Sequence, residues 1–155
     1  MENLDALDYK ILDALQSNNL ASQKDIGNKI GLSAPAVQRR IKRLREIGAI
    51  TKDIAVLNAD YLGSPITIIV QVEMETDKID QINKVKEHFR KTPQVQQCFY
   101  VTGETDFVLV IIVYTMKEYE MLTHELFFNN PAVKQFNTSI AMDVIKVGLS
   151  LPIPK

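Results

Sequence analysis

Cysteine is scarce in this chain of 155 residues, and Cys98 is its only example. A single thiol cannot close an internal disulfide, and Cys98 has no cysteine or histidine neighbour at metal-ligand spacing. The sequence therefore predicts no metal site and favours a reducing compartment. We expect Cys98 to be a buried, inert thiol, as free cysteines commonly are.

Long apolar runs are also missing. No stretch approaches the roughly 20 residues that a membrane helix needs. The segment MENLDALDYK is acidic and interrupted by charge, which is not typical of a signal peptide. We therefore expect a cytoplasmic chain without a membrane segment.

The residues that mark common enzyme classes do not appear. The sequence has no G-x-x-x-x-G-K-[ST] and no G-x-G-x-x-G phosphate loop, and no nucleophile is paired with a base. His88 and His124 lie on separate predicted helices without partners, and we expect both at the surface. These absences predict a protein that is not an enzyme and needs no cofactor.

Excess charge of one sign is absent overall but present locally. The net charge is only -1, yet residues 1–50 sum to +2 and residues 54–155 to -3. Positions 34–45 carry five basic side chains and no acidic one. A merely solvated helix face usually mixes signs, so this segment indicates a binding surface for a polyanion.

Three helices are predicted in the first 50 residues. Apolar residues at helical spacing place them at 5–16, 22–30 and 34–47, with Asp5 and Ser22 as N-caps of the first two. Ser33 is placed as the third N-cap. Two helices joined by a tight turn behind a supporting helix predict a helix-turn-helix.

The third helix has an apolar stripe formed by Val37, Ile41 and Leu44. Its basic residues fall on the opposite face, so we expect it to enter the major groove of duplex DNA. Residues near its start are predicted to reach the edges of the nucleobases. The basic side chains further along the helix, together with the start of the second helix, are predicted to neutralise phosphates. The predicted base readers are Ser33, Ala34, Pro35, Gln38 and Arg39, and the predicted phosphate contacts are Arg40, Lys42, Arg43, Ser22, Gln23 and Lys24.

A strand and a linker follow the third helix. The β-branched residues of 49–57 predict a strand, and the Asn, Asp, Gly, Ser and Pro residues of 58–65 are typical of a linker. We place the boundary near Asp60, giving a winged helix-turn-helix domain at 1–60 and a second domain at 61–155.

The second domain alternates strands and helices. Its predicted strands are 66–74, 95–102, 107–114 and 133–147, and its predicted helices are 78–91 and 117–128. The order βαββαβ is the ferredoxin-like unit, so the chain belongs to the α+β class.

The strand at 107–113 is almost wholly apolar, which predicts that both of its faces are covered. Two helices cover one face, and a second copy of the protein is expected on the other. The strand lacks the basic and glycine residues of the aromatic RNA signature, which disfavours RNA binding.

The turn at 103–106 allows two interpretations. Gly103 permits close backbone approach, and the amides of Glu104, Thr105 and Asp106 can form a concavity for a carboxylate. The Asp106 carboxylate then either takes an ammonium group or fixes the turn. The plainer interpretation is a hairpin turn, because Gly and Asp are ordinary turn residues.

The whole chain resembles the leucine-responsive regulatory protein/AsnC (feast/famine) family of transcription regulators. The resemblance rests on Leu4-Asp5 with Asp8 and Ile11-Leu12, on Gly31-Leu32-Ser33, on Val37 to Ile50, and on Thr102-Gly103-Glu104-Thr105-Asp106. It implies an N-terminal DNA-binding domain and a C-terminal domain that oligomerises and binds an amino acid.

What the resemblance implies is a homodimer that assembles further, to an octamer, and holds its effector at the 103–106 turn. Leucine or methionine is the expected effector. The implied effector residues are Tyr100, Gly103, Glu104, Thr105, Asp106, Thr138, Ser139 and Ile140. The alternatives are an amino-acid-binding module that never touches DNA and a DNA organiser that needs no effector.

Overall fold

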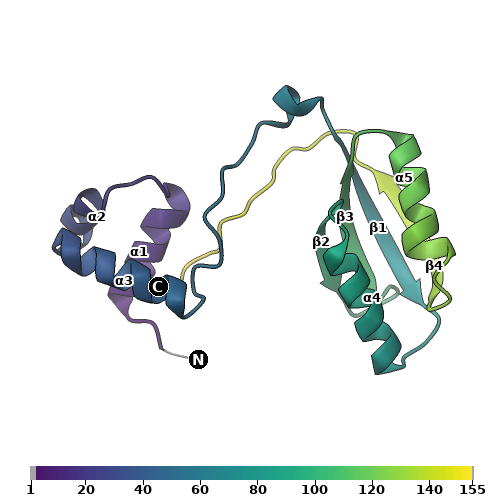
Figure 1. The fold of residues 1–155 in the computed structure, drawn as a ribbon, viewed down its shortest axis with the longest axis horizontal. Helices are drawn as coiled ribbons and strands as arrows, with labels where there is room; N and C mark the ends of the chain where they lie inside the picture. Colours follow the sequence, from purple (N-terminus) through teal and green to yellow (C-terminus); the bar gives the residue numbers. More distant parts are fainter. Residues whose placement is uncertain (1–2, 155) are drawn as a thin grey trace. The chain divides into compact units, whose positions relative to one another are not determined.

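The computed structural model describes residues 3–154, which divide into two compact units (Figure 1). Among these residues, one unit comprises 3–56 with 147–154, and the other comprises 57–146. Residues 147–154 thus pack with the first unit. The predicted domain at 61–155 had placed them in the second. The Gln16 amide holds them by donating to the Leu151 carbonyl at 2.8 Å and accepting from its N–H at 3.0 Å.

The first unit contains three helices. They are α1 (Ala6–Ser17), α2 (Gln23–Ile30) and α3 (Ala34–Glu46). Asp5 caps α1 in a capping box with Asp8, and Ser22 caps α2 by accepting from the Asp25 N–H. Ser33 stands at the start of α3, but its side chain makes no capping hydrogen bond. The predicted stripe Val37, Ile41 and Leu44 is buried, which confirms the orientation of α3.

The turn between α2 and α3 depends on two glycines. Gly31 adopts φ 77° at the end of α2, a left-handed conformation that favours glycine. Gly27 faces the Leu32 carbonyl, and a Cβ on Gly27 would lie 2.3 Å from that oxygen. The close approach of α2 to the turn therefore requires a glycine, which has no Cβ, at position 27.

The predicted strand at 49–57 does not form. Residues 51–57 have no regular structure and are exposed, and only the 3-10 turn η1 (Ala59–Leu62) interrupts the connection to the second unit. No described segment of the chain pairs with 49–57, so its β-branched residues lack the cross-strand partner that a strand needs. The predicted wing is thus absent.

The second unit is a four-stranded antiparallel sheet in the order β2-β3-β1-β4. Its strands are β1 (Ile66–Met74), β2 (Val95–Tyr100), β3 (Phe107–Val113) and β4 (Val133–Ile140), and its helices are α4 (Ile79–Lys91) and α5 (Met116–Thr123). The predicted βαββαβ order and the α+β class are confirmed.

Two elements end earlier than predicted. Helix α5 stops at Thr123 and continues as one wide turn, η2 (His124–Phe128), whose Leu126 and Phe127 are buried. Strand β4 ends at Ile140 and not at 147, because β1, its only partner in the described chain, begins pairing at Ile68. The β-branched residues that follow are therefore exposed.

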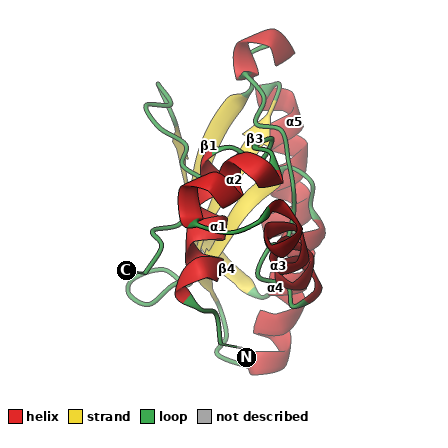
Figure 2. Ribbon diagram, turned by 90° about the vertical axis from the view of Figure 1, so that its left-hand side faces the viewer, coloured by secondary structure: helices red, strands yellow, loops and turns green. Residues whose placement is uncertain are grey.

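Helices α4 and α5 lie on one side of the sheet (Figures 1 and 2). Alternate β3 residues, from Phe107 to Val113, are buried beneath them, and Phe89 of α4 packs edge-on against Phe107. The other sheet face bears Val108, Val110 and Ile112, each partly exposed, with Ile69 40% and Phe99 51% exposed. No described segment of residues 57–146 covers this face.

Candidate nucleic-acid interface and effector turn

The predicted base readers share the exposed side of α3. Ser33, Pro35, Gln38 and Arg39 are exposed, and Ala34 is half-buried. Arg39 makes no ion pair with any described residue. Lys42, one turn further on, lies 3.8 Å from Glu46, with both side chains largely exposed. This side of α3 therefore presents hydrogen-bonding groups that are free to meet DNA.

Arg40 and Arg43 are engaged with helix α1. Arg40 Nη1 donates to Asp5 Oδ2 at 2.7 Å and to Asp8 Oδ1 at 2.8 Å, and Arg43 Nη2 donates to Asp8 Oδ2 at 2.8 Å. The Asp8 side chain is fully buried, whereas those of Arg40 and Arg43 are 28% and 37% exposed. The carboxylates thus hold the buried side of each guanidinium, and the other side reaches the surface.

The protonation equilibria follow from this geometry. Burial raises the pKa of Asp8, but hydrogen bonds from Arg43, from the Asp5 backbone and from Arg40 outweigh burial and hold that pKa below its ordinary value. The Asp8 backbone N–H, followed by Arg40, lowers the pKa of Asp5. Hydrogen bonds to Asp5 and Asp8 raise the pKa of Arg40. The network is therefore fully charged at neutral pH.

The network is the feature that sequence reasoning missed. The sequence predicts Asp5 only as an N-cap, and Arg40 and Arg43 only as phosphate contacts. A signal existed in the matched spacing, because each pair is three residues apart and so lies on one face of its helix. The pairing itself depends on how α1 crosses α3.

The start of α2 supplies the remaining predicted phosphate contacts. Ser22, Gln23 and Lys24 are all exposed. The Ser22 hydroxyl donates to Asp25 Oδ2 at 2.6 Å, so it is already occupied as a cap. Its neighbours Gln23 and Lys24 are exposed, and neither side chain makes a hydrogen bond or ion pair with a described residue.

In the second unit, the turn after β2 leaves backbone donors unused. Gly103 adopts φ 128°, and none of the N–H groups of residues 102–105 donates to an acceptor in the described chain. By contrast, the Val101 N–H donates to the Asp106 carbonyl, and the Asp106 N–H donates to the Val72 carbonyl. Four consecutive free amides lie between these two closing bonds.

The side chains of this turn are committed to holding it in place. Asp106 Oδ2 accepts from the Met74 N–H at 2.7 Å, and the Thr105 hydroxyl donates to the Val72 carbonyl at 2.8 Å. Of the two roles considered for Asp106, the structure thus shows the one that fixes the turn. Glu104 is exposed.

The other predicted effector residues do not converge on this turn within one chain. Strands β3 and β1 separate β2 from β4, which carries Thr138, Ser139 and Ile140. Thr138 faces the helices, where its hydroxyl lies 2.5 Å from Tyr119 Oη, while Ser139 lies on the opposite face. Tyr100 also turns to the helix side, with its ring 5.0 Å from that of Phe107.

Of three minor predictions, two need correction and the third holds. Cys98 is exposed, because β2 is an edge strand that the helices only partly cover. His88 has a partner, with Nε2 3.5 Å from Glu125 Oε1, since α4 and η2 lie side by side. His124 is exposed as predicted but packs against the Phe128 ring at 5.1 Å.

Neither a membrane span nor a metal site is found among residues 3–154. No helix in this range is both apolar and long enough to span a bilayer. No group of three His, Cys, Asp or Glu side chains in the same range is arranged to hold a metal ion.

A basic recognition helix joined to an α/β unit with a donor-rich turn defines a DNA-binding regulator with a ligand-binding domain. The sequence profile of the AsnC-type helix-turn-helix domain matches residues 4–45, and that of the Lrp/AsnC ligand binding domain matches residues 67–151. The chain belongs to the Lrp/AsnC family of transcriptional regulators and is not an enzyme.

Similar proteins span nearly the whole chain. An uncharacterized HTH-type transcriptional regulator, y4tD, of Sinorhizobium fredii is 38% identical over 97% of this chain and 89% of its own. The leucine-responsive regulatory protein of Haemophilus influenzae is 33% identical over 92% of this chain and 86% of its own. A transcriptional regulator of Neisseria meningitidis in complex with L-Met is 27% identical, with a TM-score of 0.83 over 97% of both chains.

Proposed function

We propose that the chain regulates transcription in the cytoplasm as a homodimer that places α3 of each copy in successive major grooves. The two recognition helices then lie about 34 Å apart, one helical turn of DNA. Ser33, Ala34, Pro35, Gln38 and Arg39 face the base edges. Arginine pairs well with guanine and glutamine with adenine, so Arg39 and Gln38 carry most of the sequence preference.

The phosphate contacts come from residues around these readers. Lys42, Gln23, Lys24 and Ser22 lie exposed beside them. Arg40 and Arg43 are proposed to add phosphate contacts from the side of each guanidinium group that reaches the surface. The observation that carries this assignment is the exposed basic side of α3 above a buried apolar stripe.

A titration of the protein against duplexes from the promoter of its own gene tests this mode. Arg39→Ala should weaken binding to the preferred duplex by about 1 to 3 kcal/mol, and should weaken binding to a scrambled duplex far less. Lys42→Ala should weaken both equally and lower the salt slope by about one. Equal loss on all sequences for Arg39→Ala would remove its role as a base reader, and binding to no duplex at low salt would leave an amino-acid-binding module.

For the ligand-binding domain we propose an amino acid effector, leucine or methionine, at the 103–106 turn. The four free N–H groups of residues 102–105 suit a carboxylate. Asp106 Oδ2 accepts from the Met74 N–H, which leaves Oδ1 as one acceptor for the ammonium group. Thr138, Ser139 and Ile140 of a neighbouring copy are proposed to complete the pocket with Tyr100. The L-Met complex of the Neisseria relative supports this ligand class.

Calorimetric titration of the twenty amino acids tests the effector. Gly103→Leu should abolish binding, since a side chain at φ 128° strains the turn. Asp106→Ala should weaken it by loosening the turn. Unchanged affinity in both variants would place the site elsewhere, and no binding to wild type would leave an effector-independent DNA organiser.

We further propose that the exposed sheet face forms the dimer and that dimers assemble to an octamer. Ile69, Phe99 and the partly exposed β3 valines give this face the apolar character of an interface. Mass measurement in solution decides the assembly, and a monomer at every concentration would contradict it. An effector then alters DNA affinity only by binding two assembly states differently.

A further inference from the structure

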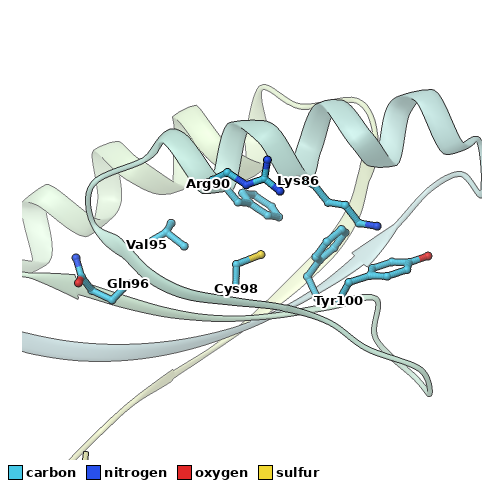
Figure 3. Close-up of a pocket in the computed structure, with 8 residues that line it drawn as sticks. Lys86, Arg90, Val95, Gln96, Cys98 and Tyr100 are labelled. Carbon is cyan, nitrogen blue, oxygen red and sulfur yellow. The ribbon is translucent and has the colours of Figure 1, made fainter. Parts of the chain in front are cut away.

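A groove of about 340 Å³ lies between helix α4 and the edge strand β2 (Figure 3). Phe89 and Phe107, both buried, are among its lining residues. Cys98 and Tyr100 line it from β2, and Lys86 and Arg90 line it from α4. Its volume lies within the range of small-molecule pockets. Of its lining residues, only Tyr100 also belongs to the proposed effector site.

The groove is open because the helix layer stops short of the edge strand. Cys98 pairs with Leu109 and Tyr100 with Phe107 on the helix side of the sheet. Leu109 and Phe107 are buried, yet Cys98 and Tyr100 are exposed. A register shift between Val95 and Gln97 bends β2 at the end of the groove.

The charge on the groove is of one sign. Lys86 and Arg90 are one helical turn apart on the same face of α4, and no carboxylate lines the groove. Lys86 Nζ lies 3.8 Å from the centre of the Tyr100 ring. Arg90 pairs with Glu87 at 2.8 Å, but this pair is largely exposed and so is weak.

The positive charges of Lys86 and Arg90 both act on the Cys98 thiol. Burial among the groove walls raises the pKa of Cys98, and the charges of Arg90 and Lys86 partly oppose that rise. Cys98 lines the same groove as Lys86 and Arg90, so its reactivity can report on what binds there.

We propose that this groove binds a small carboxylate with an apolar side chain and no ammonium group, such as a 2-oxo acid. Arg90 and Lys86 bind the carboxylate, since charge-assisted hydrogen bonds to it are short and strong. Its hydrocarbon chain lies on Phe89 and Phe107 and excludes water from them. An amino acid is disfavoured because its ammonium group would meet two cations and no carboxylate.

The site is separate from the proposed effector turn. It lies on the helix side of the sheet, so a dimer formed through the opposite sheet face leaves it open. Tyr100 is the only residue common to both. The regulator would thereby respond to an amino acid and to a deaminated acid through different residues.

Alkylation of Cys98 by iodoacetamide provides the test, because the chain has no other cysteine and its mass reports on one site. At a concentration of 4-methyl-2-oxopentanoate about four times its Kd, alkylation should slow about fivefold. The same concentration of leucine should leave the rate nearly unchanged. Protection should vanish in the double variant Lys86→Gln, Arg90→Gln, compared with and without the acid.

Two controls separate this site from its surroundings. Lys84→Gln removes a cation from the same helix outside the groove and should keep full protection. Gly103→Leu alters the effector turn and should also keep full protection of Cys98. A failure of leucine to bind in calorimetry therefore bears only on the proposed effector site. No protection up to about 10 mM, equal protection by leucine, or protection that survives the double variant would each overturn the proposal.

Discussion

The DNA-binding unit buries five apolar residues in its core together with the carboxylate of Asp8, whereas the ligand-binding unit buries sixteen residues in one cluster. The buried polar residues described in the second unit are only Thr92 and Thr123. A three-helix unit of this size has little interior to bury. Its helices are therefore fixed in part by directional ion pairs, while the larger unit relies on packing.

The largest effect is expected where packing dominates. Phe89 is fully buried, and its ring meets those of Phe107 and Phe127 at 5.5 and 6.1 Å. Phe89→Ala should cost about 3 to 5 kcal/mol of unfolding free energy in the ligand-binding unit. Urea unfolding followed by far-UV circular dichroism measures this, with DNA binding by the first unit as the control. An unchanged midpoint would show that Phe89 is not part of a close-packed core.

A somewhat smaller loss is expected where ion pairs dominate. Asp8→Asn keeps the shape but leaves Arg40 and Arg43 without their shared partner. We expect the free energy of unfolding to fall by about 2 to 3 kcal/mol. This is below the range for fully buried ion pairs, because both guanidinium groups can turn toward water. DNA affinity should also fall, although the change removes a negative charge from a DNA-binding unit. A variant that binds DNA more tightly would show that Asp8 does not position these arginines.

Gly27→Ala tests the turn between α2 and α3. The added methyl would lie 2.3 Å from the Leu32 carbonyl, so the turn must shift. The expected cost is about 1 to 3 kcal/mol, with loss of sequence-specific DNA binding. Gln23→Ala, on the exposed side of α2, is the matched control and should leave the melting temperature unchanged. A stable, fully active Gly27→Ala would contradict the observed close approach.

The two units should also differ in their response to acid. The pKa of Asp8 in the folded state lies below its ordinary value of 3.8. Its stabilisation is therefore complete above the unfolded-state pKa and is lost as pH falls through the lowered one. Thermal melts between about pH 6 and 2.5 should show the DNA-binding unit weakening first, below about pH 4, and Asp8→Asn should flatten this dependence. If both units lost stability over the same pH range, the Asp5, Asp8, Arg40 and Arg43 network would not account for the acid sensitivity of the DNA-binding unit.

The smallest effect on folding is expected at Lys42. Its contact with Glu46 is long and exposed, so Lys42→Ala should leave the melting temperature unchanged. Only the salt dependence of DNA binding should respond. A clear drop in the melting temperature would mean that Lys42 has a structural role like that of Arg40.

Periodicity predicted most of the helices and strands, because each follows from local spacing of apolar residues. Val37, Ile41 and Leu44 marked the buried side of α3, and alternation from Phe107 to Val113 marked β3. The exceptions share one cause. Residues 49–57 and 141–147 have strand-like composition, but a strand needs a partner, and the described chain supplies none there.

The sequence by itself determined the helix-turn-helix, the βαββαβ order and the basic side of α3, since these depend on residues close together in the chain. The tertiary structure decided which charges are free. Asp8 lies 32 residues before Arg40, and only the crossing of α1 over α3 brings them together. The same holds for Asp106 and Met74 and for the groove between α4 and β2, because contacts over such separations depend on how whole elements pack.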